Sequence, residues 1–159
     1  MDPSIGTKDT ASSLRPDGTL SPEQVVREFL GALERFDVER ATELLDPAVT
    51  YQNVPFPPAR GRDAVAKQLQ GFEHYCSAFE VIHHNIATDG NVVLTERTDI
   101  ITVGKVPGAF WVCGTFEVHD GRITVWRDRF DFIDFTWSFV RGGVQALLGR
   151  TPGRRSTAT

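Results

Sequence analysis

The sequence predicts an α+β fold in which helices near the N-terminus pack on one face of a curved, mainly antiparallel β-sheet. Three observations predict it. Apolar residues recur at helical spacing as far as about residue 79, and beyond that point they alternate with a period of two, as in strands. Two hairpin turn signals, Asp89-Gly90-Asn91 and Asp120-Gly121, divide the second half of the chain into long paired strands. No repeat or low-complexity tract interrupts this pattern.

Three helices are expected before the period changes. Ser21, Pro22 and Gln24 form a capping-box pattern, which predicts that a helix starts there and continues to about residue 36. A second, short helix is expected over residues 38–45, because Asp46-Pro47 follows and the residue before a proline disfavours helical geometry. A third helix is expected from Gly61 to about Phe79. The inward stripes of the first and third helices are Val26, Leu30 and Leu33, and Val65, Leu69 and Phe72.

Five strands and a last helix complete the predicted order. The first strand covers residues 49–54 and ends at prolines 55, 57 and 58. The other four strands cover residues 80–88, 92–103, 110–119 and 122–132, with residues 104–108 as a loop between the two hairpins. Residues 133–148 are amphipathic and are expected to form a helix, although Gly142-Gly143 weakens its middle.

The composition is that of one ordinary folded domain, with 159 residues of which 40% are hydrophobic and 24% charged. The net charge of -4 argues against nucleic acid or an anionic membrane as partner, and no segment is apolar enough to span a membrane. Cys76 and Cys113 have no metal or redox spacing and indicate a reduced, cytoplasmic protein, and the histidines lack the spacing of a metal site. We expect residues 1–19 to form a disordered leader, residues 20–149 the folded domain, and residues 150–159 a disordered basic tail.

Arg97 and Asp99 are the most unusual pair in the sequence. They lie in an apolar strand that includes Leu94 and Ile100, and their side chains point to the same face because strand side chains repeat every two residues. Burying such charges costs several kcal/mol each unless they are paired and hydrogen-bonded. A structural ion pair meets this requirement, and so does a catalytic pair. The two residues alone leave both interpretations open.

Further polar residues occupy one face of other strands. Tyr51 and Asn53 are two apart on the first strand, and Asp128 shares a face of the last strand with Trp126, Phe130 and Phe132. Alternation does not establish that these faces meet. If they do, two carboxylates, a guanidinium, a phenol and an amide gather within apolar walls. One carboxylate can then take a proton from water while the other gives a proton to a leaving oxygen, which suits the addition of water to a strained electrophile.

Four groups of residues carry a resemblance to a known family, over about residues 21–135. They are Tyr51-Gln52-Asn53, then Pro57-Pro58 with Gly61-Arg62-Asp63-Ala64-Val65, then Glu96-Arg97-x-Asp99, and finally Gly121-Arg122-Ile123-x-x-Trp126-Arg127-Asp128-x-Phe130-Asp131. In order and spacing this pattern resembles the limonene-1,2-epoxide hydrolase family. The resemblance implies the cone-shaped α+β fold shared with nuclear transport factors and ketosteroid isomerases, with a mixed, mainly antiparallel sheet around a deep apolar pocket. It also implies a homodimer.

The resemblance implies a reaction as well, the one-step addition of water to a lipophilic epoxide to give a vicinal diol, without metal or organic cofactor. Carried over by motif, Asp128 resembles the general base that activates water, and Tyr51 and Asn53 resemble the residues that hold this water. Asp99 resembles the general acid that protonates the epoxide oxygen. Arg97 resembles the bridge between the two aspartates.

Five apolar residues have the phase of pocket walls, namely Leu30, Leu33, Ile101, Phe130 and Phe135. Such walls favour an epoxide of terpene type or of a bulkier fatty or steroid type, and a role in lipid metabolism or detoxification. Two alternatives stay open. One is an enzyme of the same fold that resembles ketosteroid isomerases or polyketide cyclases. Arg97 argues against this alternative, because an enolate-stabilising carboxylic acid is kept neutral by apolar surroundings and not placed beside a guanidinium. The other is a non-catalytic lipid-binding or dimeric scaffold protein.

Overall fold

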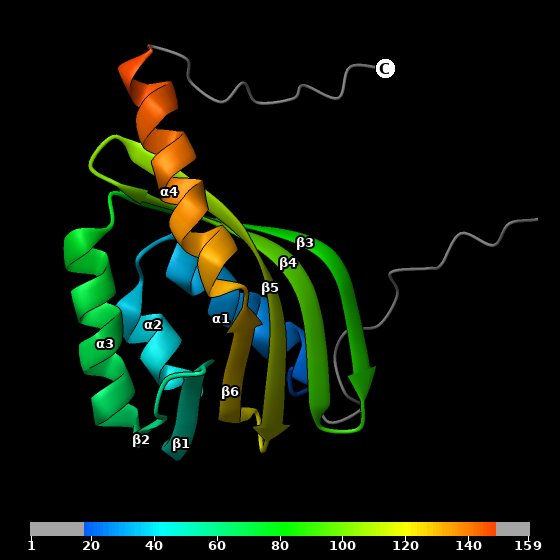
Figure 1. Ribbon diagram of the computed structural model, residues 1–159. Helices are drawn as coiled ribbons and strands as arrows, with labels where there is room; N and C mark the ends of the chain where they lie inside the picture. The colour runs from blue at the N-terminus through cyan, green and yellow to red at the C-terminus, as the bar shows by residue number, and fades with distance from the viewer. Residues whose placement is uncertain (1–17, 149–159) are drawn as a thin grey trace, which may run out of the picture.

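The computed structural model describes residues 18–148 (Figure 1). Most of the expected leader (residues 1–17) and the whole expected basic tail (residues 150–159) lie outside the described residues. In chain order the elements are α1 (Pro22–Glu34), α2 (Val38–Glu43), β1 (Leu45–Val54), β2 (Ala59–Arg60), α3 (Arg62–Tyr75), β3 (Ala78–Asp89), β4 (Val92–Val103), β5 (Val106–His119), β6 (Arg122–Phe130) and α4 (Phe132–Leu147).

One six-stranded sheet organises these elements, in the order β2-β1-β6-β5-β4-β3. β1 runs parallel to β6, and the other neighbouring pairs are antiparallel, so the sheet is mixed and mainly antiparallel, as predicted. The sheet curves around α1, with α2 and α3 beside it, and α4 crosses over β5 (Figure 1). No helix among residues 18–148 is long and apolar enough to cross a membrane.

The start of α1 confirms the predicted capping box. The backbone N–H of Ser21 donates to the side chain of Gln24 over 2.8 Å, and the Ser21 hydroxyl accepts from the backbone N–H of Gln24. The apolar stripe of α1 is buried, and the Phe29 ring packs edge-on against the Trp126 ring of β6, with centroids 4.9 Å apart. The helix is therefore fixed against the strand that carries Asp128.

β1 begins at Leu45 rather than at residue 49, and α2 ends before it at Glu43. Leu45 is fully buried and pairs with Ile123 of β6, whose burial outweighs the helical pattern of residues 38–45. The register of β1 against β6 shifts between Leu45 and Thr50, and Pro47 falls within this irregularity, where a missing N–H is tolerated. The predicted helix over residues 38–45 is therefore too long at its C-terminal end, and the predicted start of the strand at residue 49 is too late.

The predicted loop over residues 104–108 is wrong, because a two-residue turn joins β4 to β5. Val103 pairs with Val106, and Gly104 adopts a φ of 61°, which favours glycine. β5 then continues through Pro107 and Gly108. A Cβ at Gly108 would lie 2.6 Å from the Phe139 ring, so this glycine lets α4 lie directly on the strand.

β6 ends two residues earlier than predicted, at Phe130. Asp131 caps α4, because its side chain accepts from the backbone N–H groups of Ile133 and Asp134. Phe132 consequently belongs to the helix and is half exposed, so the prediction that it shares the face of Trp126 on the strand is wrong.

α4 continues through Gly142-Gly143, the pair expected to weaken it. Gly142 is buried, and a Cβ there would overlap the backbone carbonyl of Pro107, whereas a Cβ at Gly143 would meet nothing. Gly142 therefore allows close contact between helix and sheet, and the packing offsets the low helix propensity of glycine.

The two faces of β4 differ sharply. Val93, Thr95, Arg97 and Asp99 are buried on the concave side, whereas Leu94 is 51% exposed on the other side. The apolar pattern of this strand therefore does not mark burial on both faces. The charged pair lies on the buried face.

Candidate active site

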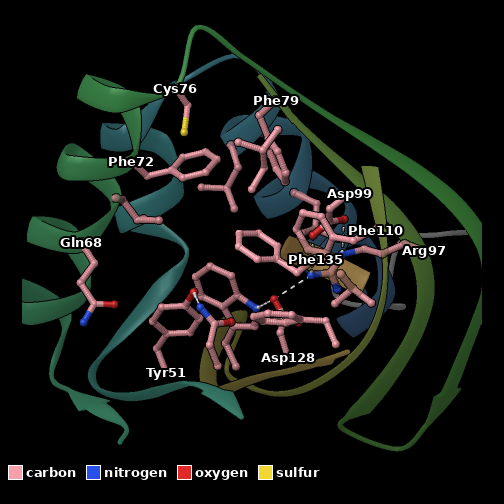
Figure 2. A pocket seen from close by; sticks show the side chains of 18 of the residues that line it. Tyr51, Gln68, Phe72, Cys76, Phe79, Arg97, Asp99, Phe110, Asp128 and Phe135 are labelled. Atoms are coloured by element: carbon pink, nitrogen blue, oxygen red, sulfur yellow. Dashed lines mark hydrogen bonds and ion pairs between the residues drawn. The ribbon is translucent and has the colours of Figure 1, made fainter. Parts of the chain in front are cut away.

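A cavity of about 430 Å³ lies on the concave side of the sheet, against α1, α3 and α4 (Figure 2). Its volume falls within the range of small-molecule sites, roughly 300–1,000 Å³. Figure 2 shows Tyr51 and Asp128 on one side of it, with Phe72 and Cys76 on the opposite side. The ten residues that the sequence predicted for the site all line this cavity: Leu30, Leu33, Tyr51, Asn53, Arg97, Asp99, Ile101, Asp128, Phe130 and Phe135.

Arg97 is the centre of the polar cluster, and its side chain is 1% exposed. Its Nε donates to Asp99 Oδ1 over 2.8 Å and its Nη2 to Asp99 Oδ2 over 3.2 Å, so this pair is bidentate. Nη2 also donates to Asp128 Oδ2 over 2.7 Å, and Nη1 donates to the Thr95 hydroxyl over 3.0 Å. The guanidinium therefore bridges two carboxylates that lie on β4 and β6.

The two oxygens of Asp128 have different surroundings. Oδ2 accepts from Arg97 and, over 2.9 Å, from the indole N–H of Trp126. Oδ1 is buried and has no hydrogen-bond partner among residues 18–148. Buried carboxylate oxygens are normally paired, so an unpaired oxygen in a cavity wall is free to accept a proton from a bound molecule.

The parallel pairing of β1 with β6 brings Tyr51 and Asn53 beside Asp128. Asn53 lies in register with Asp128, and Tyr51 lies in register with Trp126, on whose ring it stacks with centroids 3.8 Å apart. The Asn53 side-chain amide donates to the Tyr51 hydroxyl over 2.6 Å. Since this hydroxyl already accepts one bond, its own proton is available to donate into the cavity.

Burial and neighbouring charges shift the pKa values of Asp99, Tyr51 and Arg97. Desolvation raises the pKa of Asp99 to about 6, against the Arg97 guanidinium, which lowers it, and with support from the Asp128 charge. Desolvation and the Asp128 charge also raise the pKa of Tyr51, so its phenol stays protonated. Burial alone would lower the pKa of Arg97, but the two aspartates raise it, so the guanidinium keeps its charge.

A match to known proteins accompanies this geometry. The family model described as the limonene-1,2-epoxide hydrolase catalytic domain matches residues 20–141, which include every predicted site residue. The chain belongs to this family. It is 42% identical, over 123 residues, to the epoxide hydrolase EphG of Mycobacterium tuberculosis (strain ATCC 25618 / H37Rv), a match that covers 77% of this chain and 82% of EphG.

Solved structures agree with membership of the epoxide hydrolase family. A limonene-epoxide-hydrolase-like enzyme of Mycobacterium tuberculosis superimposes with a TM-score of 0.76 at 41% identity, covering 80% of this chain and 96% of that one. A SnoaL-like polyketide cyclase from Shewanella denitrificans superimposes with a TM-score of 0.69 at 14% identity, covering 80% and 99% of the two chains. The second likeness shows the fold alone, and it agrees with the predicted α+β fold.

Several lining residues of this hydrolase-family cavity were missed by sequence reasoning. Strand periodicity placed Trp126 on the same face as Asp128, but it gave Trp126 no role as a donor to the carboxylate or as a lining residue. α3 forms part of the rim, where Gln68 and Tyr75 are exposed. Phe72 was predicted on the inward stripe of this helix but was not predicted to line the cavity, as it does. The remaining missed lining residues are Leu69, Gly71, Cys76, Phe79, Phe110 and Val112.

The arrangement places two carboxylates, Asp99 and Asp128, on one guanidinium. Asp99 has a raised pKa and can carry a proton, while Asp128 lines the cavity and has one oxygen without a hydrogen-bond partner among residues 18–148. Two carboxylates in such different surroundings can serve as a general acid and a general base. In residues 18–148 no three His, Cys, Asp or Glu side chains gather as a metal site.

Proposed function

We propose that this chain is an epoxide hydrolase that adds water in one step to a lipophilic epoxide and releases a vicinal diol. In this proposal Asp128 is the general base, Asp99 is the general acid, and Arg97 bridges them. Tyr51 and Asn53 orient the attacking water. The observation that carries the proposal is the buried, unpaired Oδ1 of Asp128, on a carboxylate whose other oxygen is fixed by two donors.

The proposed reaction moves two protons in one step. Asp128 Oδ1 takes a proton from water while the water oxygen forms a bond to one epoxide carbon. The bond from that carbon to the epoxide oxygen breaks, and this oxygen takes the proton of Asp99. The products are a diol, a protonated Asp128 and an ionised Asp99. As the diol leaves, Asp128 gives its proton to solvent and Asp99 takes one from solvent, which restores both groups.

Asp99 must be protonated when the epoxide binds, and its pKa of about 6 supports this role near neutral pH. The adjacent guanidinium opposes protonation, and desolvation outweighs it. Arg97 also stabilises the negative charge that appears on Asp99 as the proton leaves, because both Asp99 oxygens accept from its N–H groups.

The cavity walls support a lipophilic substrate. Phe110, Phe130 and Phe135 pack together, with ring centroids 4.8 to 5.6 Å apart, and they line the cavity with Leu30 and Leu33. We propose an epoxide of terpene type, or a bulkier fatty or steroid epoxide, and a role in lipid metabolism or detoxification. A panel of epoxides of increasing size, scored for diol formation, identifies the preferred class.

A homodimer and a cytoplasmic location also belong to the proposal. The homodimer rests on the family resemblance, and light scattering of the purified chain tests it, with a monomeric mass at assay concentration counting against it. The cytoplasmic location is supported by the free thiols of Cys76 and Cys113. Fractionation of the source cells tests it.

Turnover in water enriched in heavy oxygen separates the proposed hydrolysis from the alternatives. The proposal predicts a diol that contains one labelled oxygen. An isomerised ketone or enol product would instead support the isomerase or cyclase alternative, and tight retention of the epoxide without product would support a binding protein. Either of these results overturns the proposal.

A further inference from the structure

The orientation of Arg97 is not explained by its carboxylate partners alone. The Arg97 side chain starts on β4, and its guanidinium reaches Asp128 on β6. The side chain must therefore pass across β5, which lies between these strands. The register shows what lies underneath. Thr95 of β4 pairs with Gly114 of β5, and Gly114 pairs with Asp128 of β6.

Gly114 provides the space for this crossing. A Cβ at this position would overlap Arg97 Nη1, and it would lie 2.5 Å from the Thr95 hydroxyl and 2.9 Å from the Phe116 ring. No positive φ requires glycine here, since Gly114 is absent from the residues with positive φ in the described chain. A residue without a side chain is therefore required by the close approach of the guanidinium, of the Thr95 hydroxyl that accepts from it, and of the Phe116 ring.

Thr95 holds the opposite end of the guanidinium. Its hydroxyl accepts from Arg97 Nη1 over 3.0 Å, and the residue is only 3% exposed. Nε and Nη2 of the same guanidinium point to Asp99 and Asp128. Because the guanidinium is planar and rigid, fixing Nη1 on Thr95 sets the directions of its other N–H groups.

We propose that Thr95 and Gly114 are positioning residues that hold the Arg97 guanidinium in the one orientation that joins Asp99 to Asp128. This inference rests on the proposed function, because it assigns a purpose to the bridge between acid and base. Neither residue touches the reacting atoms in this account. Thr95 acts by accepting one bond, and Gly114 acts by leaving room.

A purely structural role makes different predictions. If Thr95 and Gly114 only fill the sheet, their substitution changes stability and leaves the kinetics of the folded enzyme unchanged. If they position Arg97, substitution lowers kcat and moves the pH dependence of turnover while KM stays nearly constant, since neither residue lines the cavity.

The first test compares Thr95→Val with Thr95→Ser, using the best epoxide of the panel. Valine keeps the branched shape but removes the acceptor, while serine keeps the hydroxyl. Because a hydrogen bond to a charged group contributes more than a neutral one, we expect T95V to lower kcat roughly tenfold, with KM within about twofold and T95S within about threefold of the wild type. Thermal unfolding of each variant reports the folded fraction used in the rates.

The pH profile supplies a readout that a structural role does not move. The charged or titratable groups facing Asp99 are Arg97 on its own strand, Asp128 on β6, Glu34 on α1 and Tyr51 on β1. Of these, Arg97 lowers the pKa of Asp99. A loosened guanidinium lowers it less, so the basic limb of the T95V profile should move upward by about 0.5 unit, and the T95S limb should not.

Gly114→Ala tests the second residue, with Gly143→Ala as a control in open space. We expect G114A to lose at least about a hundredfold in kcat and G143A to match the wild type. Wild-type kcat and pH profile in T95V, or wild-type kcat in G114A, would overturn the positioning role. A failure of the proposed function gives a different result. The wild type would then form no labelled diol, or the Asp99→Asn variant would react at the wild-type rate.

Discussion

Replacing Arg97 by glutamine removes the cation from the centre of the buried cluster. The guanidinium donates two hydrogen bonds to Asp99, one to Asp128 and one to Thr95, and its side chain is 1% exposed. Glutamine carries no charge and cannot reproduce the fork. Removing one partner of a buried ion pair leaves an uncompensated charge and costs about 3–5 kcal/mol, a large part of the roughly 5–15 kcal/mol that stabilises an ordinary domain.

The loss should depend on pH, with a sign set by Asp99. Its pKa in the folded protein is already raised to about 6, and Arg97 is the group that lowers it. Without Arg97 the folded-state pKa rises further above the unfolded value. The folded state then binds more protons than the unfolded state, so the stability of Arg97→Gln falls as the pH rises through this interval. We expect a larger destabilisation at pH 8 than at pH 5.

Urea unfolding of the wild type and the variant at both pH values measures these differences. Arg141→Gln is the matched control, because its ion pair with Asp134 is half exposed and should contribute no more than about 1 kcal/mol. A loss in Arg97→Gln that does not exceed the loss in Arg141→Gln at pH 8 would contradict a stabilising role of the buried guanidinium. So would a loss that is larger at pH 5.

Three further predictions concern the proton transfers and the packing of α4. Asp99→Asn and Asp128→Asn should each lower kcat by about 10²- to 10⁴-fold while the thermal unfolding profile stays cooperative, and wild-type turnover in either variant would contradict the assigned roles. In the wild type, kcat should fall as the pH rises through about 6, because Asp99 must hold a proton, whereas a limb near the ordinary value of about 3.9 would contradict this assignment. Gly142→Ala should destabilise the protein by about 1–3 kcal/mol because its Cβ overlaps the Pro107 carbonyl. Gly143→Ala, whose Cβ meets nothing, should stabilise the protein by about 0.5–1 kcal/mol. Chemical denaturation measures both changes, and equal effects of the same sign would contradict the packing of the helix.

Local patterns predicted most of the elements and the shared face of Arg97 and Asp99. Alternation places side chains two apart on one side of a strand, so it identified each half of the cluster. It could not identify the cluster itself, because the parallel pairing that sets Asn53 beside Asp128 joins segments about 75 positions apart in the chain. The family resemblance, rather than periodicity, suggested that these faces meet.

The predictions that were wrong or absent have specific physical causes. Residues 104–108 were predicted as a loop, but a tight turn at Gly104 allows β5 to begin at Val106. Thr95 and Gly114 were not predicted as site residues, because a threonine and a glycine are common on strands. Their contact with Arg97 depends on the path of the Arg97 side chain across three strands. Such information resides in register and packing, which single-sequence patterns do not contain.

Direct attack by water that Asp128 activates can be tested by a single-turnover experiment in water enriched in heavy oxygen. With enzyme in excess over epoxide, each active site reacts once. We expect the diol of this first turnover to contain one labelled oxygen, and we expect mass spectrometry of the digested protein to find no label in Asp99 or Asp128. An unlabelled first-turnover diol, with label entering an aspartate when the ester is hydrolysed, would show that a carboxylate attacks the epoxide and would contradict direct attack by water.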